Sequence, residues 1–214
     1  MDEFYFDELE LTDFIKNVVK KMKTEENNFD AYVDLTTAVN RELFLGNINY
    51  GTGAYIENYI RFWNRQDELK NIPVEERKPI KIYIDSQGGS LTDTFTIIDA
   101  ISLSKTPVWT INIGTAYSGG FFSFIAGHKR IAYPSASFLY HEGACGNTGD
   151  AGKFRNFAAF YEKQLNYLKT ITLKYTKISE EEYEKHIKDD WWITADEAID
   201  LGICDEIAKE CLNG

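Results

Sequence analysis

The chain has 214 residues, a formal net charge of −11 at pH 7 and a hydrophobic content of 43%. This length suits one domain, and the hydrophobic and aromatic content predicts a folded core rather than a disordered chain. Nucleic acid and anionic membrane surfaces are excluded as partners, because the chain has no excess of Lys and Arg to neutralise phosphates.

The first 28 residues predict an N-terminal extension. They begin with an acidic stretch, which lacks the basic region and apolar run of a secretory signal. Apolar residues at helical spacing then predict an amphipathic helix: Phe14, Ile15, Val18, Val19 and Met22. This helix either packs on its own subunit or forms an arm that contacts a partner. The chain also has no apolar run of about 20 residues. We therefore expect a soluble protein that stays in the cytoplasm.

Residues 29–214 predict a single domain with alternating strands and helices. Predicted strands cover 42–46, 80–84, 108–113 and 130–133, and predicted helices cover 55–63, 92–103 and 118–126. A charged loop from Asn64 to Lys78 interrupts the alternation. Such a rhythm predicts an α/β fold with a parallel sheet, right-handed crossovers and helices packed on the sheet.

The pattern changes after His141. One long helix is predicted over Lys153 to Tyr175, long enough to project from the domain. Two capping-box signatures, Ser179 to Glu182 and Thr194 to Glu197, then predict two short helices. Asp190 is expected in the loop between them.

Three segments carry residues suited to nucleophilic catalysis. Ser118 lies at a predicted strand-to-helix turn, His141 ends a predicted strand, and Asp190 supplies a carboxylate. A serine hydroxyl needs a base such as histidine, and a carboxylate fixes the imidazole tautomer. Backbone N–H groups at Gly119 and at the Gly88-Gly89 turn are candidate donors to an oxyanion.

Each of these residues also has an ordinary structural interpretation. Glycine pairs are common in strand-to-helix turns, and Ser118 alone is typical of a small packing residue. His141 alone fits a satisfied core or surface histidine, and Asp190 fits a solvated loop carboxylate. His128 and His186 are expected to be exposed and are given no role.

The cysteines and the acidic residues give no sign of a cofactor. Three cysteines without framework spacing or a Cys-x-x-Cys motif predict reduced thiols that serve as packing residues: Cys145, Cys204 and Cys211. No ligand cluster has zinc or calcium spacing, so neither a metal nor a cofactor is expected.

As an ordered set, these motifs resemble the ClpP-type family of caseinolytic Clp serine proteases. The set comprises Ser86-Gln-Gly-Gly89, Gly114-Thr-Ala-Tyr-Ser118, Leu139-Tyr-His141, the helix Lys153 to Tyr175, and Asp190-Trp-Trp-Ile-Thr-Ala195. The resemblance covers about Phe29 to Ile207. It implies the spiral of ββα units that this family shares with crotonases, with the long helix as a projecting handle.

The resemblance also implies roles and partners. Ser118 becomes the nucleophile, His141 the general base and Asp190 the orienting acid, with Gly89 and Gly119 as oxyanion donors. Family members hydrolyse polypeptides, form homo-oligomers of one heptameric ring or two stacked rings, and usually receive substrate from an AAA+ Clp ATPase. The expected activity is that of a serine endopeptidase.

Departures from the family pattern keep other interpretations open. Gln87 replaces a proline, Glu142-Gly143 replaces Gln-Pro, and Lys188-Asp189 replaces an acidic-Arg pair used in ring-to-ring contacts. The alternatives are a phage capsid-maturation protease of the same fold, a catalytically silent ring subunit, and a crotonase-type acyl-CoA enzyme.

Overall fold

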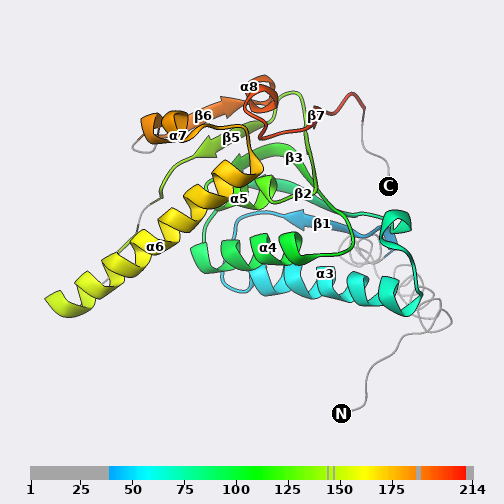
Figure 1. Cartoon of the computed structure of the whole chain (residues 1–214), viewed down its shortest axis with the longest axis horizontal. Helices are drawn as coiled ribbons and strands as arrows, with labels where there is room; N and C mark the ends of the chain where they lie inside the picture. The colour runs from blue at the N-terminus through cyan, green and yellow to red at the C-terminus, as the bar shows by residue number, and fades with distance from the viewer. Residues whose placement is uncertain (1–38, 144, 147, 187–188, 211–214) are drawn as a thin grey trace, which may run out of the picture. The chain divides into compact units, whose positions relative to one another are not determined.

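A seven-stranded sheet organises the computed structural model (Figure 1), which describes residues 39–143, 145–146, 148–186 and 189–210. The predicted extension over residues 1–28 lies outside these ranges. From Leu43 onward the described residues belong to one unit. The strands are β1 (Glu42–Leu45), β2 (Ile80–Ser86), β3 (Val108–Tyr117), β4 (Lys129–Ala132), β5 (Ser137–Tyr140), β6 (Trp191–Thr194) and β7 (Glu206–Ile207).

Helices cover the sheet and connect its strands. They are α3 (Thr52–Leu69), α4 (Leu91–Leu103), α5 (Gly119–Ile125), α6 (Ala151–Tyr175), α7 (Glu180–His186) and α8 (Ala195–Asp200), with a 3-10 turn η1 (Val74–Glu76). Figure 1 shows α3 and α4 side by side below β1 and β2. The alternation of strands and helices confirms the predicted α/β fold.

The strand order explains how distant segments meet. Strands β1, β2, β3, β4 and β7 lie in that order, while β5 pairs with β3 and with β6. The pairs of β2 with β3, β3 with β4, β3 with β5 and β4 with β7 are parallel, as predicted. The pair of β5 with β6 is antiparallel and was not expected. Asp190 lies in a loop between α7 and α8, as predicted, but this loop leads into the strand β6, which the sequence analysis missed.

Apolar side chains from the sheet and from the helices that cover it form the core. Ile80, Ile82 and Ile84 of β2 are fully buried, as are Phe121 and Phe124 of α5. Burying one such side chain contributes about 1.5–3 kcal/mol relative to leaving it in water. One face of β2 is buried along its whole length, whereas the other face carries Lys81, Tyr83 and Asp85 and becomes exposed toward the end of the strand.

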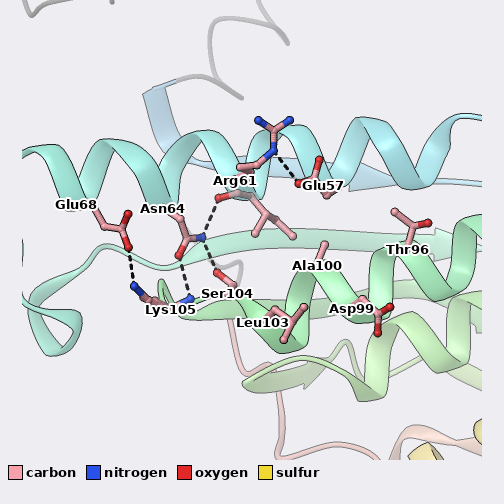
Figure 2. Close-up of a pocket in the computed structure, with 11 residues that line it drawn as sticks. Glu57, Arg61, Asn64, Glu68, Thr96, Asp99, Ala100, Leu103, Ser104 and Lys105 are labelled. Carbon is pink, nitrogen blue, oxygen red and sulfur yellow. Dashed lines mark hydrogen bonds and ion pairs between the residues drawn. The ribbon is translucent and has the colours of Figure 1, made fainter.

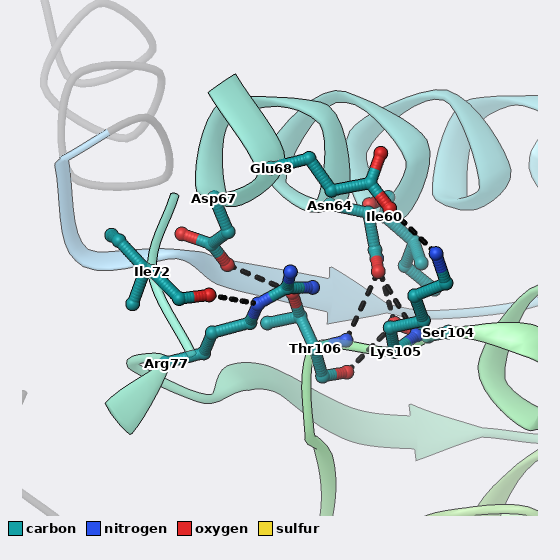
Figure 3. Close-up of polar contacts among 9 residues, drawn as sticks. All are labelled: Ile60, Asn64, Asp67, Glu68, Ile72, Arg77, Ser104, Lys105 and Thr106. Carbon is teal, nitrogen blue, oxygen red and sulfur yellow. Dashed lines mark hydrogen bonds and ion pairs between the residues drawn. The ribbon is translucent and has the colours of Figure 1, made fainter. Parts of the chain in front are cut away.

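The helix α3 continues six residues into the predicted charged loop, because polar groups there are buried and paired (Figure 3). Asp67 is fully buried and accepts a hydrogen bond from Thr106 Oγ1 at 2.7 Å. Thr106 Oγ1 in turn accepts a hydrogen bond from Arg77 Nη1 at 3.3 Å. Asn64 Oδ1 accepts the backbone N–H groups of Lys105 and Thr106. These bonds hold the end of α3 against the segment that enters β3.

The helix α6 extends away from the sheet, as the sequence predicted (Figure 1). Its buried residues are Leu168, Ile171 and Thr172, all in its C-terminal third. The helix begins two residues before the predicted start, because the Asp150 side chain accepts the N–H of Lys153 at 2.9 Å and caps the first turn. The part of α6 before this third is mostly exposed, although the Tyr161 hydroxyl donates to the Glu142 carbonyl at 2.9 Å.

The cysteine prediction is right in part. Cys145 and Cys204 are free thiols, and Cys204 is buried as a packing residue. Cys145 is exposed and does not pack, while Cys211 lies outside the described residues. No described helix combines the length and the apolar character needed to cross a bilayer.

Candidate active site

Ser118 lies at the junction between β3 and α5. Its φ of 52° and ψ of −118° place it in a region that residues other than glycine rarely adopt. Its N–H donates to the Leu139 carbonyl at 2.9 Å, which ties the junction to β5. Because such backbone strain is concentrated at functional sites, the conformation supports the interpretation of Ser118 as a nucleophile.

The glycine turn after β2 contacts the Ser118 junction, as the sequence predicted. Gly88 and Gly89 have φ values of +87° and +143°. A Cβ atom at Gly88 would lie 2.7 Å from the Gly119 nitrogen and 2.8 Å from Ser118 Cβ, so only glycine permits this approach. At Gly89 a Cβ atom would lie 2.1 Å from the Ile48 carbonyl oxygen. The two turns are packed backbone against backbone.

Two backbone N–H groups at these turns have no hydrogen-bond partner among the described residues. On either side of Gly89, the Gly88 carbonyl accepts the Ile48 N–H at 2.8 Å and the Ser90 N–H donates to the Ile48 carbonyl at 2.7 Å. Within the described part of the chain, the N–H groups of Gly89 and Gly119 donate to no other residue. Unpaired N–H donors at neighbouring turns are what an oxyanion requires.

His141 and Asp190 are brought together by strand register. In the antiparallel pair, Tyr140 of β5 faces Trp191 of β6. His141, which follows β5, therefore faces Asp190, which precedes β6. His141 Nδ1 lies 3.5 Å from Asp190 Oδ1. The side chains are 32% and 58% exposed. This distance exceeds an ordinary hydrogen bond, so the pair is in contact without a tight bond.

Strand register also relates Ser118 to His141, without a hydrogen bond between their side chains. In the parallel pair of β3 with β5, Tyr117 faces Leu139, so Ser118 and His141 lie one and two residues beyond this register pair. Among the described residues, Ser118 Oγ takes part in no hydrogen bond, and none joins it to the imidazole. Long or absent catalytic hydrogen bonds are common in proteins without bound substrate.

Gln87, which stands in the glycine turn, is held by hydrogen bonds on two sides. Its N–H donates to Asn47 Oδ1 at 3.1 Å, and its side-chain amide donates to Thr115 Oγ1 at 3.3 Å. Thr115 in turn donates from its hydroxyl and its N–H to Asp85 Oδ1. These contacts restrain the turn at a position where the sequence has no proline.

The two histidines without a predicted role differ in their surroundings. His186 is partly buried, because its ring stacks on Trp191 with centroids 4.1 Å apart and its Nε2 lies 2.9 Å from Glu182 Oε1. The prediction that His186 is exposed is therefore wrong. His128 is exposed as predicted, and its Nδ1 accepts the backbone N–H of Val108 at 2.9 Å. This bond makes His128 a structural residue at the start of β3.

Two buried tyrosines beside the candidate site were missed by the sequence analysis. Tyr140 immediately precedes His141, and Tyr183 lies in α7. Each is 2% exposed, and the hydroxyl of Tyr140 donates to that of Tyr183. The sequence signal was the position of Tyr140 next to the candidate base. Nothing in the sequence indicates that the two side chains meet.

A pocket of about 450 Å³ lies between α3 and α4 (Figure 2). Ion pairs cross and flank it, including Lys105 with Glu68 at 2.8 Å and Arg61 with Glu57 at 2.8 Å. The candidate catalytic residues do not line it. We treat it as a surface groove between two helices, separate from the site at the ends of β2, β3 and β5.

The fold and the comparisons with known proteins define the class of this chain as a serine-type peptidase. The Clp protease family model matches residues 70–211, which is more than half of the chain. The chain belongs to the Clp protease family. A relative from Treponema denticola, described as ATP-dependent Clp protease proteolytic subunit 2, is 28% identical over 198 residues, which span 92% of this chain and 95% of the relative. These findings confirm the predicted family.

Proposed function

We propose that this chain is the proteolytic subunit of a compartmentalised endopeptidase, with Ser118 as nucleophile, His141 as general base and Asp190 as orienting acid. The observation that carries the proposal is the 3.5 Å contact of His141 with Asp190 beside the strained Ser118 junction. His141 and Asp190 are far apart in the sequence but in contact. The register of β3 with β5 supports a place for Ser118 near them, because Ser118 and His141 follow the paired residues Tyr117 and Leu139 by one and two positions. A purely structural role for these residues does not require that arrangement.

The proposed reaction has two steps. Ser118 Oγ attacks the peptide carbonyl carbon while His141 accepts the hydroxyl proton, and the developing oxyanion accepts hydrogen bonds from Gly89 and Gly119. The C–N bond then breaks as His141 returns the proton to the leaving amine, which leaves an acyl-enzyme. In the second step, water attacks the acyl carbon, His141 takes and returns its proton, and Ser118 is released.

The assembly and its partners are part of the same proposal. Family membership supports a homo-oligomer of heptameric rings, single or stacked as a tetradecamer, that receives unfolded polypeptide from an AAA+ Clp ATPase. The length of α6 beyond its buried third supports contacts with another subunit. We further propose that residues 1–28 are an extension to a protease domain at 29–214, and that the free thiols reflect the reducing cytoplasm.

A second candidate function is a catalytically silent ring subunit. The unbonded Ser118 hydroxyl favours it, because an assembled triad normally joins the serine to the histidine. This candidate keeps the fold and the assembly but predicts no acyl transfer.

Labelling with a fluorophosphonate separates the two candidates. We expect the wild-type assembly to be modified at Ser118, the Ser118→Ala variant to remain unmodified, and the His141→Ala variant to react far more slowly. Native mass spectrometry of the same sample should give seven or fourteen chains. An assembled ring that stays unlabelled would establish the silent subunit instead.

A further inference from the structure

The Tyr140–Tyr183 hydrogen bond joins the two segments that carry the proposed base and acid. Tyr140 is the last residue of β5, directly before His141, and Tyr183 is the only buried residue of α7, the helix that precedes Asp190 in the chain. The hydroxyl of Tyr140 donates to that of Tyr183, and both side chains are 2% exposed. A bond between these two rings therefore links the ends of both catalytic segments inside the core.

The same pair also contacts the helix that follows the nucleophile. Tyr140 packs against Phe121 and Phe122 of α5, with ring centroids 5.9 and 5.8 Å apart and steep interplanar angles. Its ring lies 5.2 Å from that of Tyr183. The helix α5 begins immediately after Ser118. One aromatic cluster thus touches the three segments from which the proposed triad comes.

Two other kinds of contact hold α7. The partly buried ring of His186 stacks on Trp191 of β6, with centroids 4.1 Å apart, and ion pairs join α7 to α6 at the surface. Lys169 of α6 pairs with Glu180 and Glu184, whose side chains are 72% and 52% exposed. Exposed ion pairs contribute little to stability and fix position weakly. The buried tyrosine bond is therefore the contact best able to fix the distance between α7 and β5.

Removing the hydroxyl oxygen of either tyrosine breaks the hydrogen bond between them. Burial raises the pKa of both tyrosines, so both stay neutral hydroxyls at physiological pH. Removing one hydroxyl leaves the other buried without its partner, whereas removing both leaves two apolar rings of nearly the same shape. Stability and position can therefore be separated by experiment.

We propose that the Tyr140–Tyr183 hydroxyl pair positions Asp190 against His141, so that both tyrosines are positioning residues for catalysis. The inference rests on the proposed function. The pair touches no reacting atom and acts only through the contact of His141 with Asp190. Its loss should lower the rate of acyl transfer without weakening substrate binding.

The test uses Tyr140→Phe, Tyr183→Phe and the double variant in the full-length assembly. Tyr175→Phe is the matched control, because it also removes a hydroxyl that bonds another hydroxyl, that of Ser102 at 3.0 Å. The readouts are the fluorophosphonate labelling rate and the kcat and KM for a short fluorogenic peptide. We expect both single variants to lose thermal stability and the double variant to regain it.

Activity should not follow stability. In the double variant we expect kcat and the labelling rate to fall about tenfold to a hundredfold with KM unchanged, while Tyr175→Phe keeps wild-type rates. In an Asp190→Asn background, the two Phe substitutions should lower kcat no further, because the aspartate through which they act is gone. A purely structural role would instead lower the rate by the same factor in both backgrounds.

Several outcomes would overturn the inference. Wild-type kcat in the stable double variant, or a raised KM with unchanged kcat, excludes positioning. A further loss in the Asp190→Asn background also excludes it. If the double variant does not fold, each folded single variant is compared in both backgrounds by the same criteria. Wild-type protein that resists labelling overturns the proposed function itself, whereas labelled protein with insensitive variants overturns this inference alone.

Discussion

Replacing Gly88 with alanine should slow acyl transfer by about a hundredfold or more, because the glycine turn and the Ser118 junction are in backbone contact. The new Cβ atom would lie 2.7 Å from both the Gly119 nitrogen and the Tyr117 carbonyl oxygen. The turn must therefore move by roughly 0.7 Å to reach the 3.4 Å at which ordinary contact begins. A misplacement of about 1 Å at a catalytic centre costs on the order of a hundredfold in rate, and loss of one oxyanion donor costs as much.

Gly51→Ala is the matched control for this prediction. Gly51 has a φ of +91°, close to that of Gly88, but a Cβ atom there has no neighbour within 4 Å. Both variants carry the same backbone strain of about 1 kcal/mol, and only Gly88→Ala adds the collision. The assays are urea denaturation and the fluorophosphonate labelling rate. A folded Gly88→Ala protein that labels at the wild-type rate would refute the assignment of this turn to the oxyanion site.

Three further predictions concern other sites. Asp93 accepts hydrogen bonds from the Ser90 hydroxyl and the Gly51 N–H, and these bonds, the hydroxyl first, hold its pKa below the usual value of 3.8. The stability that the ionised Asp93 contributes is fully present above pH 3.8 and is lost as pH falls through the lowered pKa. Asp93→Asn should therefore be less stable at pH 7, and its unfolding free energy, measured by urea denaturation at several pH values, should fall less steeply in acid. Burial raises the pKa of Cys204 to about 11, so a thiol reagent should modify the exposed Cys145 before Cys204. Mass spectrometry after increasing reaction times measures that order. Thr194→Ala should cost about 1 kcal/mol in chemical denaturation, because it removes the capping box of α8, and unchanged stability would contradict that role.

The sequence predicted the parallel core of the fold because that information is local. Isoleucines at every second position, as in Ile80–Ile84, identify a strand with a buried face, and the glycine turns after such strands identify strand ends. The same reasoning placed Gly88 beside Ser118, since neighbouring parallel strands end at one edge of a sheet. The structure agrees with this placement.

The sequence did not predict β6 or the true end of α3, because both depend on distant residues. The four residues Trp191–Thr194 are aromatic or β-branched types that favour strands, but the segment is short and runs directly into the capping box of α8. It forms a strand through pairing with β5. The end of α3 depends on Thr106, which is far along the chain and pairs with the buried Asp67. Propensity and pattern describe neighbours in sequence, and such contacts override them.

The direction of β6 decides how the candidate site is built. The glycine turn, Ser118 and His141 all follow the carboxyl ends of parallel strands, which meet at one edge of the sheet. A further parallel strand would have carried its preceding residue to the opposite edge. Because β6 is antiparallel to β5, the residue before β6 returns to the edge where β5 ends, and Asp190 meets His141 there. The strand β5 therefore sets the position of the imidazole relative to Ser118 through β3 and relative to Asp190 through β6. A change at the end of β5 should therefore alter the position of His141 relative to both residues together.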